Sequence, residues 1–257
     1  MAIGISMIML TGDTPIRVGA VQQNLSSNWP QLSIATQTKE TDGTISFQID
    51  ETMVIMGKMP APIPWRDLEG PCSTSFLWRN ATHEVKQHSL HWLVTIMGNL
   101  EPVPLSNLLT QVTAAAMAAC PPAIGVYWPN AALVIPNKIF LDFARDVLPK
   151  GPPLYIWVDF RVGKDSEKTS AGFTHGMQAL GHMEFETQQF PEPPPELHER
   201  LMALARYVIE NGPVIRDGDT VGNDAEEHVR VIYSPSAFGH PDKVMRLIYE
   251  SPTPRAC

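Results

Sequence analysis

Cysteine is scarce in this sequence, since only Cys72, Cys120 and Cys257 occur among 257 residues. An odd number of widely spaced cysteines makes no disulfide framework and is typical of a reduced, cytoplasmic compartment. Long apolar runs are also missing, because none approaches the roughly 20 residues that span a bilayer. The apolar start, MAIGISMIML, lacks the basic flank and the cleavage pattern of a signal peptide, so we expect a first strand there.

Positive charge is in short supply. The chain has 19 lysines and arginines against 27 aspartates and glutamates, which gives a net charge of −8. Binding of nucleic acid depends on lysine and arginine contacts to phosphate, and the sequence contains no run of such residues. We therefore expect neither nucleic acid nor an anionic membrane as a partner. A basic protein would be attracted, and acidic steering would speed its association.

Motifs for nucleophilic catalysis are absent too. Cys72 with His83 or His91 would be the first pair to suspect, and Ser170 with His175 the second. Neither pair lies in a Gly-x-Ser-x-Gly or papain-like signature. Cysteine is more often a small buried apolar residue than a nucleophile. We therefore expect no catalytic residue.

Metal and acid–base motifs are equally sparse. The run HSLH places His88 and His91 on opposite faces of a strand, where one ion cannot take both. Glu184 and Glu186 would share one strand face, and a solvated face is the favoured interpretation of that pair. No dinucleotide-binding glycine fingerprint occurs. We expect no metal and no cofactor.

The apolar periodicity that is present predicts strands and about three main helices. Helices are predicted at 105–119, 138–148 and 197–211, the last with Leu197, Leu201, Leu204 and Val208 on its core face. Strands are predicted at 16–22, 43–49, 52–58, 90–97, 123–128, 131–136, 154–162, 182–190, 228–234 and 243–250.

This mixture predicts an α+β fold, with the helices packed on a largely antiparallel mixed sheet. A chain of this length can bury about 70–75% of its unfolded surface without disulfides. We expect one α+β domain over residues 1–257. A division into two similar halves, 1–150 and 151–257, stays open because no residue-level repeat supports it.

The acidic stretch VIRDGDTVGND, residues 214–224, could bind a cation or could form a tight turn without a ligand. Asp217 and Asp219 alternate around Gly218 as in a calcium-binding loop, but Val221 breaks the spacing. No lysine follows a glycine, as a phosphate-binding loop requires. Aspartate and glycine are also the residues of tight turns, so we expect a turn whose glycines are structural.

The acidic residues around this turn are the candidate contact with a basic partner. Arg216 is the only base adjacent to them, although a solvated loop is the alternative interpretation. The candidate partner-binding residues are Asp217, Asp219, Asp224, Glu226 and Glu227.

Three segments, in order, resemble the domain of unknown function family 4261. They are KTSAGFTHGMQALGHMEFE (168–186), LHERLMALARYVIENG (197–212) and RDGDTVG (216–222), within a resemblance that covers roughly residues 50–250. Similar proteins occur beside bacterial contact-dependent and type VI secretion toxins. The resemblance therefore implies an immunity protein that binds and neutralises a cognate toxin, a basic nuclease. It implies no catalytic residue or cofactor. The alternative is an enzyme of unknown reaction, a hydrolase using the acidic loop or Cys72.

Overall fold

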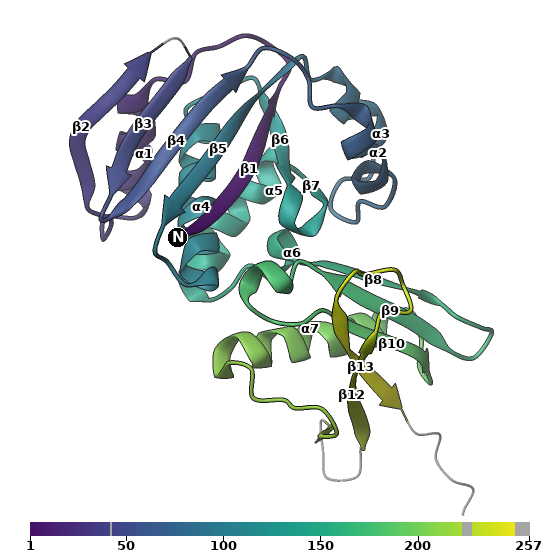
Figure 1. Cartoon of the computed structure of the whole chain (residues 1–257). Helices are drawn as coiled ribbons and strands as arrows, with labels where there is room; N and C mark the ends of the chain where they lie inside the picture. Colours follow the sequence, from purple (N-terminus) through teal and green to yellow (C-terminus); the bar gives the residue numbers. More distant parts are fainter. Residues whose placement is uncertain (42, 223–227, 250–257) are drawn as a thin grey trace, which may run out of the picture. The chain divides into compact units, whose positions relative to one another are not determined.

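The computed structural model describes residues 1–41, 43–222 and 228–249. The chain forms two compact units, Met1–Trp157 and Val158–Cys257 (Figure 1). Each unit has its own sheet. The sequence-based alternative of two halves has its boundary after residue 150. The boundary between the two units lies between Trp157 and Val158.

The first unit is built on a seven-stranded sheet in which every neighbouring pair is antiparallel. The strand order is β2-β3-β4-β5-β1-β6-β7. β1, the apolar start of the chain, therefore lies inside the sheet between β5 and β6. The strands are β1 (Ala2–Leu10), β2 (Ile34–Thr41), β3 (Thr44–Ile49), β4 (Thr52–Met59), β5 (Leu90–Gly98), β6 (Ala123–Trp128) and β7 (Leu133–Pro136).

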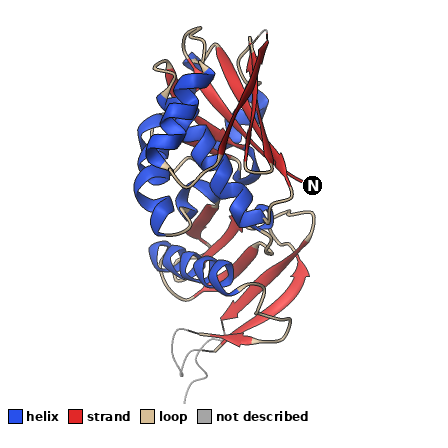
Figure 2. Cartoon of the chain, turned by 90° about the vertical axis from the view of Figure 1, so that its left-hand side faces the viewer, coloured by secondary structure: helices blue, strands red, loops and turns tan. Residues whose placement is uncertain are grey.

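Helix α4 (Pro102–Ala118) packs on one face of this sheet, against β1 and β5, and α1 (Val18–Asn28) packs on α4. The side view in Figure 2 shows these helices gathered beside the sheet. A Cβ on Gly4 would lie 3.3 Å from the side chains of both Leu105 and Leu109, so glycine allows α4 to approach closely. The other helices of the unit are α2 (Trp65–Ser73), α3 (Ala81–Glu84), α5 (Asn137–Asp142) and α6 (Leu154–Trp157).

The opposite face of β1 packs against α2 and α3. Met9 belongs to a buried cluster with Cys72 and Trp78, and strand alternation places Met9 away from the face that bears Gly4. Gly125 lies under this cluster. A Cβ there would lie 2.4 Å from the Ile135 carbonyl oxygen and 2.5 Å from the Trp78 ring, so only glycine fits.

The second unit is a six-stranded sheet with the order β11-β12-β13-β10-β9-β8. The pairs are antiparallel except β10 and β13, which run parallel. The sheet is therefore mixed and largely antiparallel. The strands are β8 (Asp159–Lys164), β9 (Ser170–His175), β10 (Phe185–Phe190), β11 (Thr220–Val221), β12 (Val229–Pro235) and β13 (Lys243–Tyr249).

Helix α7 (Pro194–Asn211) covers β8 and β9 on one face of this sheet. Its buried side chains are Leu197, Leu201, Ala205 and Val208. Leu204, predicted for the core face, is only half-buried, and that part of the prediction is wrong. The predicted helix 197–211 is otherwise confirmed, with three more residues at its start.

The α+β class is confirmed, but the predicted number of helices is wrong, because seven α-helices occur in the described ranges. α1 occupies most of the strand predicted at 16–22, and α6 occupies the start of the strand predicted at 154–162. β-branched residues favour strands locally, and packing on the rest of the unit overrides that preference. None of the helices in the described part of the chain has both the length and the apolar character needed to cross a membrane.

Candidate functional site

The acidic stretch between α7 and β11 forms a tight turn that is bonded to β12. The Asp217 carboxylate accepts the Tyr233 N–H at 2.8 Å, and the Asp219 carboxylate accepts the Arg216 N–H at 2.7 Å. The Gly218 N–H donates to the Val231 carbonyl at 2.9 Å. Gly218 has φ of +89°, which favours glycine. These bonds give both aspartates and Gly218 a structural role in the turn.

The same turn presents two of the five candidate partner-binding residues. Asp217 and Asp219 are both exposed, and they come together on one surface. Burial, followed by the charges of Asp217 and Asp219, raises the pKa of the Tyr233 phenol. The negative charges of Asp217 and Asp219 therefore disfavour ionisation of the neighbouring Tyr233 phenol. Asp224, Glu226 and Glu227 lie outside the described residues.

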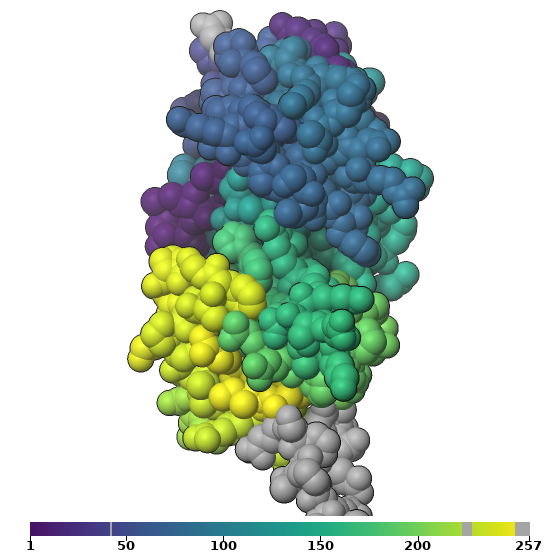
Figure 3. Space-filling model, turned by 90° about the vertical axis from the view of Figure 1, so that its right-hand side faces the viewer, coloured from purple at the N-terminus to yellow at the C-terminus, as the bar shows by residue number. Residues whose placement is uncertain are grey.

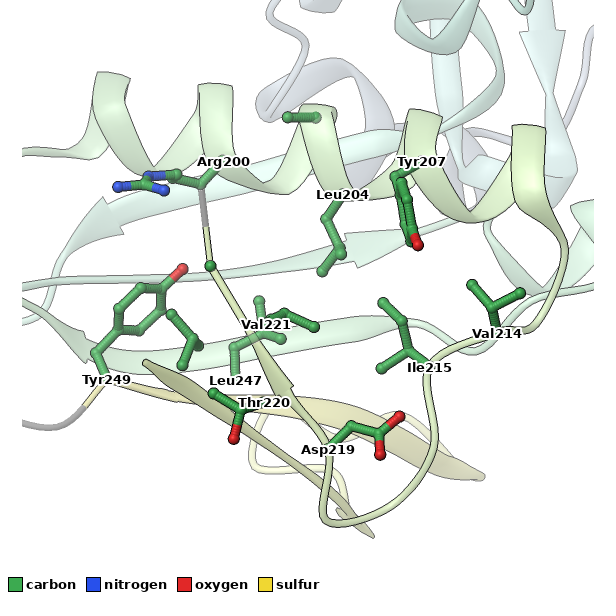
Figure 4. Close-up of a pocket in the computed structure, with 13 residues that line it drawn as sticks. Arg200, Leu204, Tyr207, Val214, Ile215, Asp219, Thr220, Val221, Leu247 and Tyr249 are labelled. Carbon is green, nitrogen blue, oxygen red and sulfur yellow. The ribbon is translucent and has the colours of Figure 1, made fainter. Parts of the chain in front are cut away.

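A groove lies beside this turn, between α7 and strands β11–β13, with a volume of about 640 Å³. Figure 4 shows Leu204 and Tyr207 reaching from α7 toward the strands that bear Val221 and Leu247. Tyr207 is 49% exposed, and Val214, on the loop after α7, is 47% exposed. Exposed apolar side chains around a concavity mark a surface suited to binding.

The groove exists because α7 covers only part of its face of the sheet. The helix packs on β8 and β9, which lie at one edge, and the groove opens toward β11–β13 at the other edge. Arg200 and Asp219 add both signs of charge to its lining. The lining therefore combines apolar side chains with charges of both signs.

Cys72 is not hydrogen-bonded to His83 or His91 in the part of the chain that the structure describes. Cys72 lies in the apolar cluster with Trp78, and burial raises the pKa of its thiol to about 11. A thiol with this pKa is protonated at neutral pH and is a poor nucleophile. His91 is hydrogen-bonded to the Ala61 carbonyl at 2.9 Å.

The prediction that one strand carries both histidines of HSLH is wrong, because His88 precedes β5 and His91 lies in it. The His88 Nε2 accepts the Ile63 N–H at 2.8 Å, and its Nδ1 donates to the Val85 carbonyl oxygen. Both ring nitrogens of His88 are thus used by the backbone. Burial lowers the pKa of His88, which favours the neutral ring that these two bonds require.

Ser170 and His175 do not meet either. They lie at the two ends of β9 and, being five residues apart, on opposite faces of the strand. The Ser170 hydroxyl donates to the Glu192 carbonyl at 2.7 Å, which is a structural bond.

The solvated face expected for Glu184 and Glu186 is wrong, because each is only 2% exposed. The Glu184 carboxylate accepts bonds from the Thr174 hydroxyl and from the N–H groups of Gly176 and Gln178, at 2.7–3.1 Å. The Glu186 carboxylate accepts the Ser236 hydroxyl and, at 2.8 Å, the Ala237 N–H. Neighbouring connections cover both residues, and the donors compensate the cost of burying the charges.

The comparisons with known proteins place a family match over this unit. Residues 173–248 match a family described as Domain of unknown function (DUF4261). The matched residues run from β9 into β13 and include α7, the acidic turn and nearly all of the groove lining. No curated protein matches the chain. No solved structure matches it.

Sequence analysis found the acidic turn but missed the groove beside it. Leu201, Leu204, Ala205 and Val208 form one wide apolar stripe on α7, and periodicity alone assigns the whole stripe to the core. A stripe that continues to Tyr207, beyond what one sheet can cover, is the signal that could have indicated a second apolar surface.

Proposed function

We propose that this protein neutralises a cognate bacterial toxin, a nuclease of basic charge, by binding it in stoichiometric amounts. The observation that carries the proposal is the groove beside α7, where exposed apolar side chains adjoin the exposed acidic turn at Asp217 and Asp219. The net charge of −8 supports the same role, and so does the immunity function that the family resemblance implies.

The expected occupant is a segment of the toxin with apolar side chains flanked by lysine or arginine. Its apolar side chains would fill the space between Leu204 and Leu247, and its basic side chains would approach Asp217 and Asp219. Tyrosine is among the residues that dominate binding energy when they lie at the centre of an interface. An interface of standard size covers about 800 Å² on each partner, so the contact would extend from the groove over the turn.

The first test compares Tyr207→Ala with Arg206→Ala, an exposed position one residue earlier on α7. The affinity for the toxin encoded beside the gene is measured by calorimetry. We expect Tyr207→Ala to weaken binding about 30-fold or more, since a hot-spot truncation costs about 2 kcal/mol or more. Arg206→Ala should change affinity little. Equal losses in the two variants would contradict the groove as the contact.

The second test removes charge without removing the hydrogen-bond acceptors of the turn. Asp217→Asn and Asp219→Asn together should slow association and reduce its dependence on salt, because steering by charge acts on the rate of encounter. Asp165→Asn, at an exposed position in the β8–β9 connection of the same unit, is the matched control. Unchanged association kinetics in the double variant would remove the acidic turn from the interface.

A third test separates inhibition from catalysis. Co-expression should abolish toxicity, and the two proteins should purify together in equal amounts. If trace amounts of this protein inactivated the toxin with turnover, the alternative of an enzyme of unknown reaction would replace the proposal.

A further inference from the structure

Three side chains from separate segments of the second unit meet where neighbouring strands of its sheet begin or end. His175 is the last residue of β9, Glu184 immediately precedes β10, and His240 lies in the connection from β12 to β13. One potential ligand atom of each lies within 4.8 Å of those of the other two. The two imidazole rings meet edge-on, with centroids 6.5 Å apart.

The topology of the sheet explains why these residues converge. β9 is antiparallel to β10, so the end of β9 lies beside the start of β10. β13 is parallel to β10, so the start of β13 lies beside the start of β10 as well. Figure 3 shows the C-terminal segments of this unit, in yellow, beside its green segments on the molecular surface.

We propose that His175, Glu184 and His240 bind a divalent transition-metal ion of the Zn²⁺ class. Two imidazoles and one carboxylate are ligands that suit Zn²⁺ and its neighbours in the first transition row, whereas Ca²⁺ and Mg²⁺ prefer sites made only of oxygen. Three protein ligands leave a fourth position of a tetrahedral ion open to water or another ligand. The sequence-based expectation of no metal would then be replaced.

Glu184 is held in one orientation by the hydrogen bonds that also bury it. Gly176 and Gln178 donate to Oε1, and the Thr174 hydroxyl donates to Oε2. The Thr174 hydroxyl oxygen in turn accepts the Phe185 N–H at 2.8 Å, which directs its proton toward Glu184. A carboxylate has about four acceptor positions, and the bonds recorded among the described residues use three of them. The remaining position, on Oε2, can bind a cation.

His240 is positioned by the second buried glutamate. The His240 N–H donates to the Ser236 hydroxyl oxygen at 3.0 Å, and that hydroxyl donates to Glu186. Gln178 ties the same connection to the turn after β9 through its amide, which donates to Asp242 at 2.8 Å. These are outer contacts of the kind that orient metal ligands.

The ring of His240 would have to change its hydrogen bond on metal binding. The Asp242 N–H donates to Nδ1 at 3.2 Å, which places the proton of the neutral ring on Nε2. Binding through Nε2 would require the other tautomer, in which Nδ1 donates to the Asp242 carbonyl oxygen, now 3.5 Å away; donation of that kind is the usual arrangement of a histidine ligand.

Closure around an ion requires only a small adjustment. Ligand atoms at about 2.0–2.1 Å from Zn²⁺ in a tetrahedron are roughly 3.3–3.5 Å apart, so contraction is of the order of 1 Å. His175 and His240 are half-buried, whereas Glu184 is buried and held by three hydrogen bonds. All three residues lie within the matched family segment 173–248.

The test titrates the full chain, first treated with a chelator, with Zn²⁺ in a calorimeter. We expect one ion per chain, and we expect His175→Ala and His240→Ala each to weaken the affinity at least about 100-fold, because loss of outer contacts alone costs about 10–100-fold. The control is His182→Ala, a half-buried histidine of the same unit outside the cluster. Glu184→Gln is avoided, because three donors depend on that carboxylate.

Binding of Co²⁺ gives a second measurement that does not depend on calorimetric heat. The visible spectrum of the bound ion should indicate four-coordination in the unsubstituted chain and in His182→Ala, and it should be lost in both cluster variants. Circular dichroism without metal confirms that the variants are folded. Equal Zn²⁺ affinity in all four proteins, or an equal loss in His182→Ala, would overturn the proposal.

Discussion

Truncation of two leucines on α7 tests how this helix divides its apolar stripe between the core and the groove. Leu201 is fully buried against the sheet, whereas Leu204 is half-buried and lines the groove. Leu201→Ala removes apolar contacts and leaves a closed cavity, which costs about 2–5 kcal/mol. Leu204→Ala opens onto the existing groove and leaves no closed cavity, so its cost should be about 1 kcal/mol, part of the value for a fully buried leucine.

Hydrogen exchange of the α7 amides measures this difference locally. Because each 1.4 kcal/mol is about a tenfold change, Leu201→Ala should lower their protection by about 30-fold to several thousandfold. Leu204→Ala should lower it about fivefold. Local measurement is preferable here, because all six tryptophans lie in the first unit and their fluorescence does not report directly on α7. Equal losses of protection in the two variants would refute the assignment of Leu204 to the groove.

Three further outcomes are expected. Gly218→Ala should destabilise the second unit by about 1–2 kcal/mol in urea unfolding, with Gly218→Asn costing less, because the positive φ is unfavourable for alanine. With Cys257 replaced by serine, iodoacetamide at pH 7.5 should label neither Cys72 nor Cys120 until the chain unfolds, since burial raises the pKa of both thiols to about 11. Burial lowers the pKa of His88 in the folded state below the usual value near 6.5, so the folded chain binds fewer protons. The contribution of His88 to the free energy of unfolding should therefore fall as the pH drops below about 6.5, by up to about 1.4 kcal/mol per pH unit. The thermal midpoint of His88→Gln should accordingly depend less on pH, between pH 7 and pH 5, than that of the unsubstituted chain.

Strong periodicity made the long elements predictable. The helix at 197–211 and the strands near 90–97 and 243–250 were identified because apolar residues recur at one spacing over two turns or several alternations. The stretch at 16–22 was assigned to a strand because Ile16, Val18 and Val21 are β-branched. Packing of Val21 and Leu25 in the first unit makes it helical, and this packing cannot be seen in a local pattern.

The candidate sites depend on contacts between distant segments, which a single sequence does not reveal. Glu184 and Glu186 were predicted to share a solvated strand face, whereas Glu184 precedes β10 and donors from the β9–β10 and β12–β13 connections bury both carboxylates. His175 and His240 meet only because the sheet brings β9 and β13 to either side of β10. The acidic turn was predictable, because aspartate and glycine favour a tight turn through local backbone geometry and local bonds such as that from the Arg216 N–H to Asp219.

The position of β13 has a consequence for how the protein is made. β13 is the last described strand along the chain, yet it lies inside the second sheet, between β12 and β10. Synthesis must therefore pass Tyr249 before this sheet can close, whereas all strands of the first sheet have been made once Pro136 is added. Until then β10 and β12 expose unpaired edges, which are prone to associate with other chains. A ribosome that stalls between Pro235 and Lys243 would release a chain whose first sheet can be complete and whose second sheet cannot.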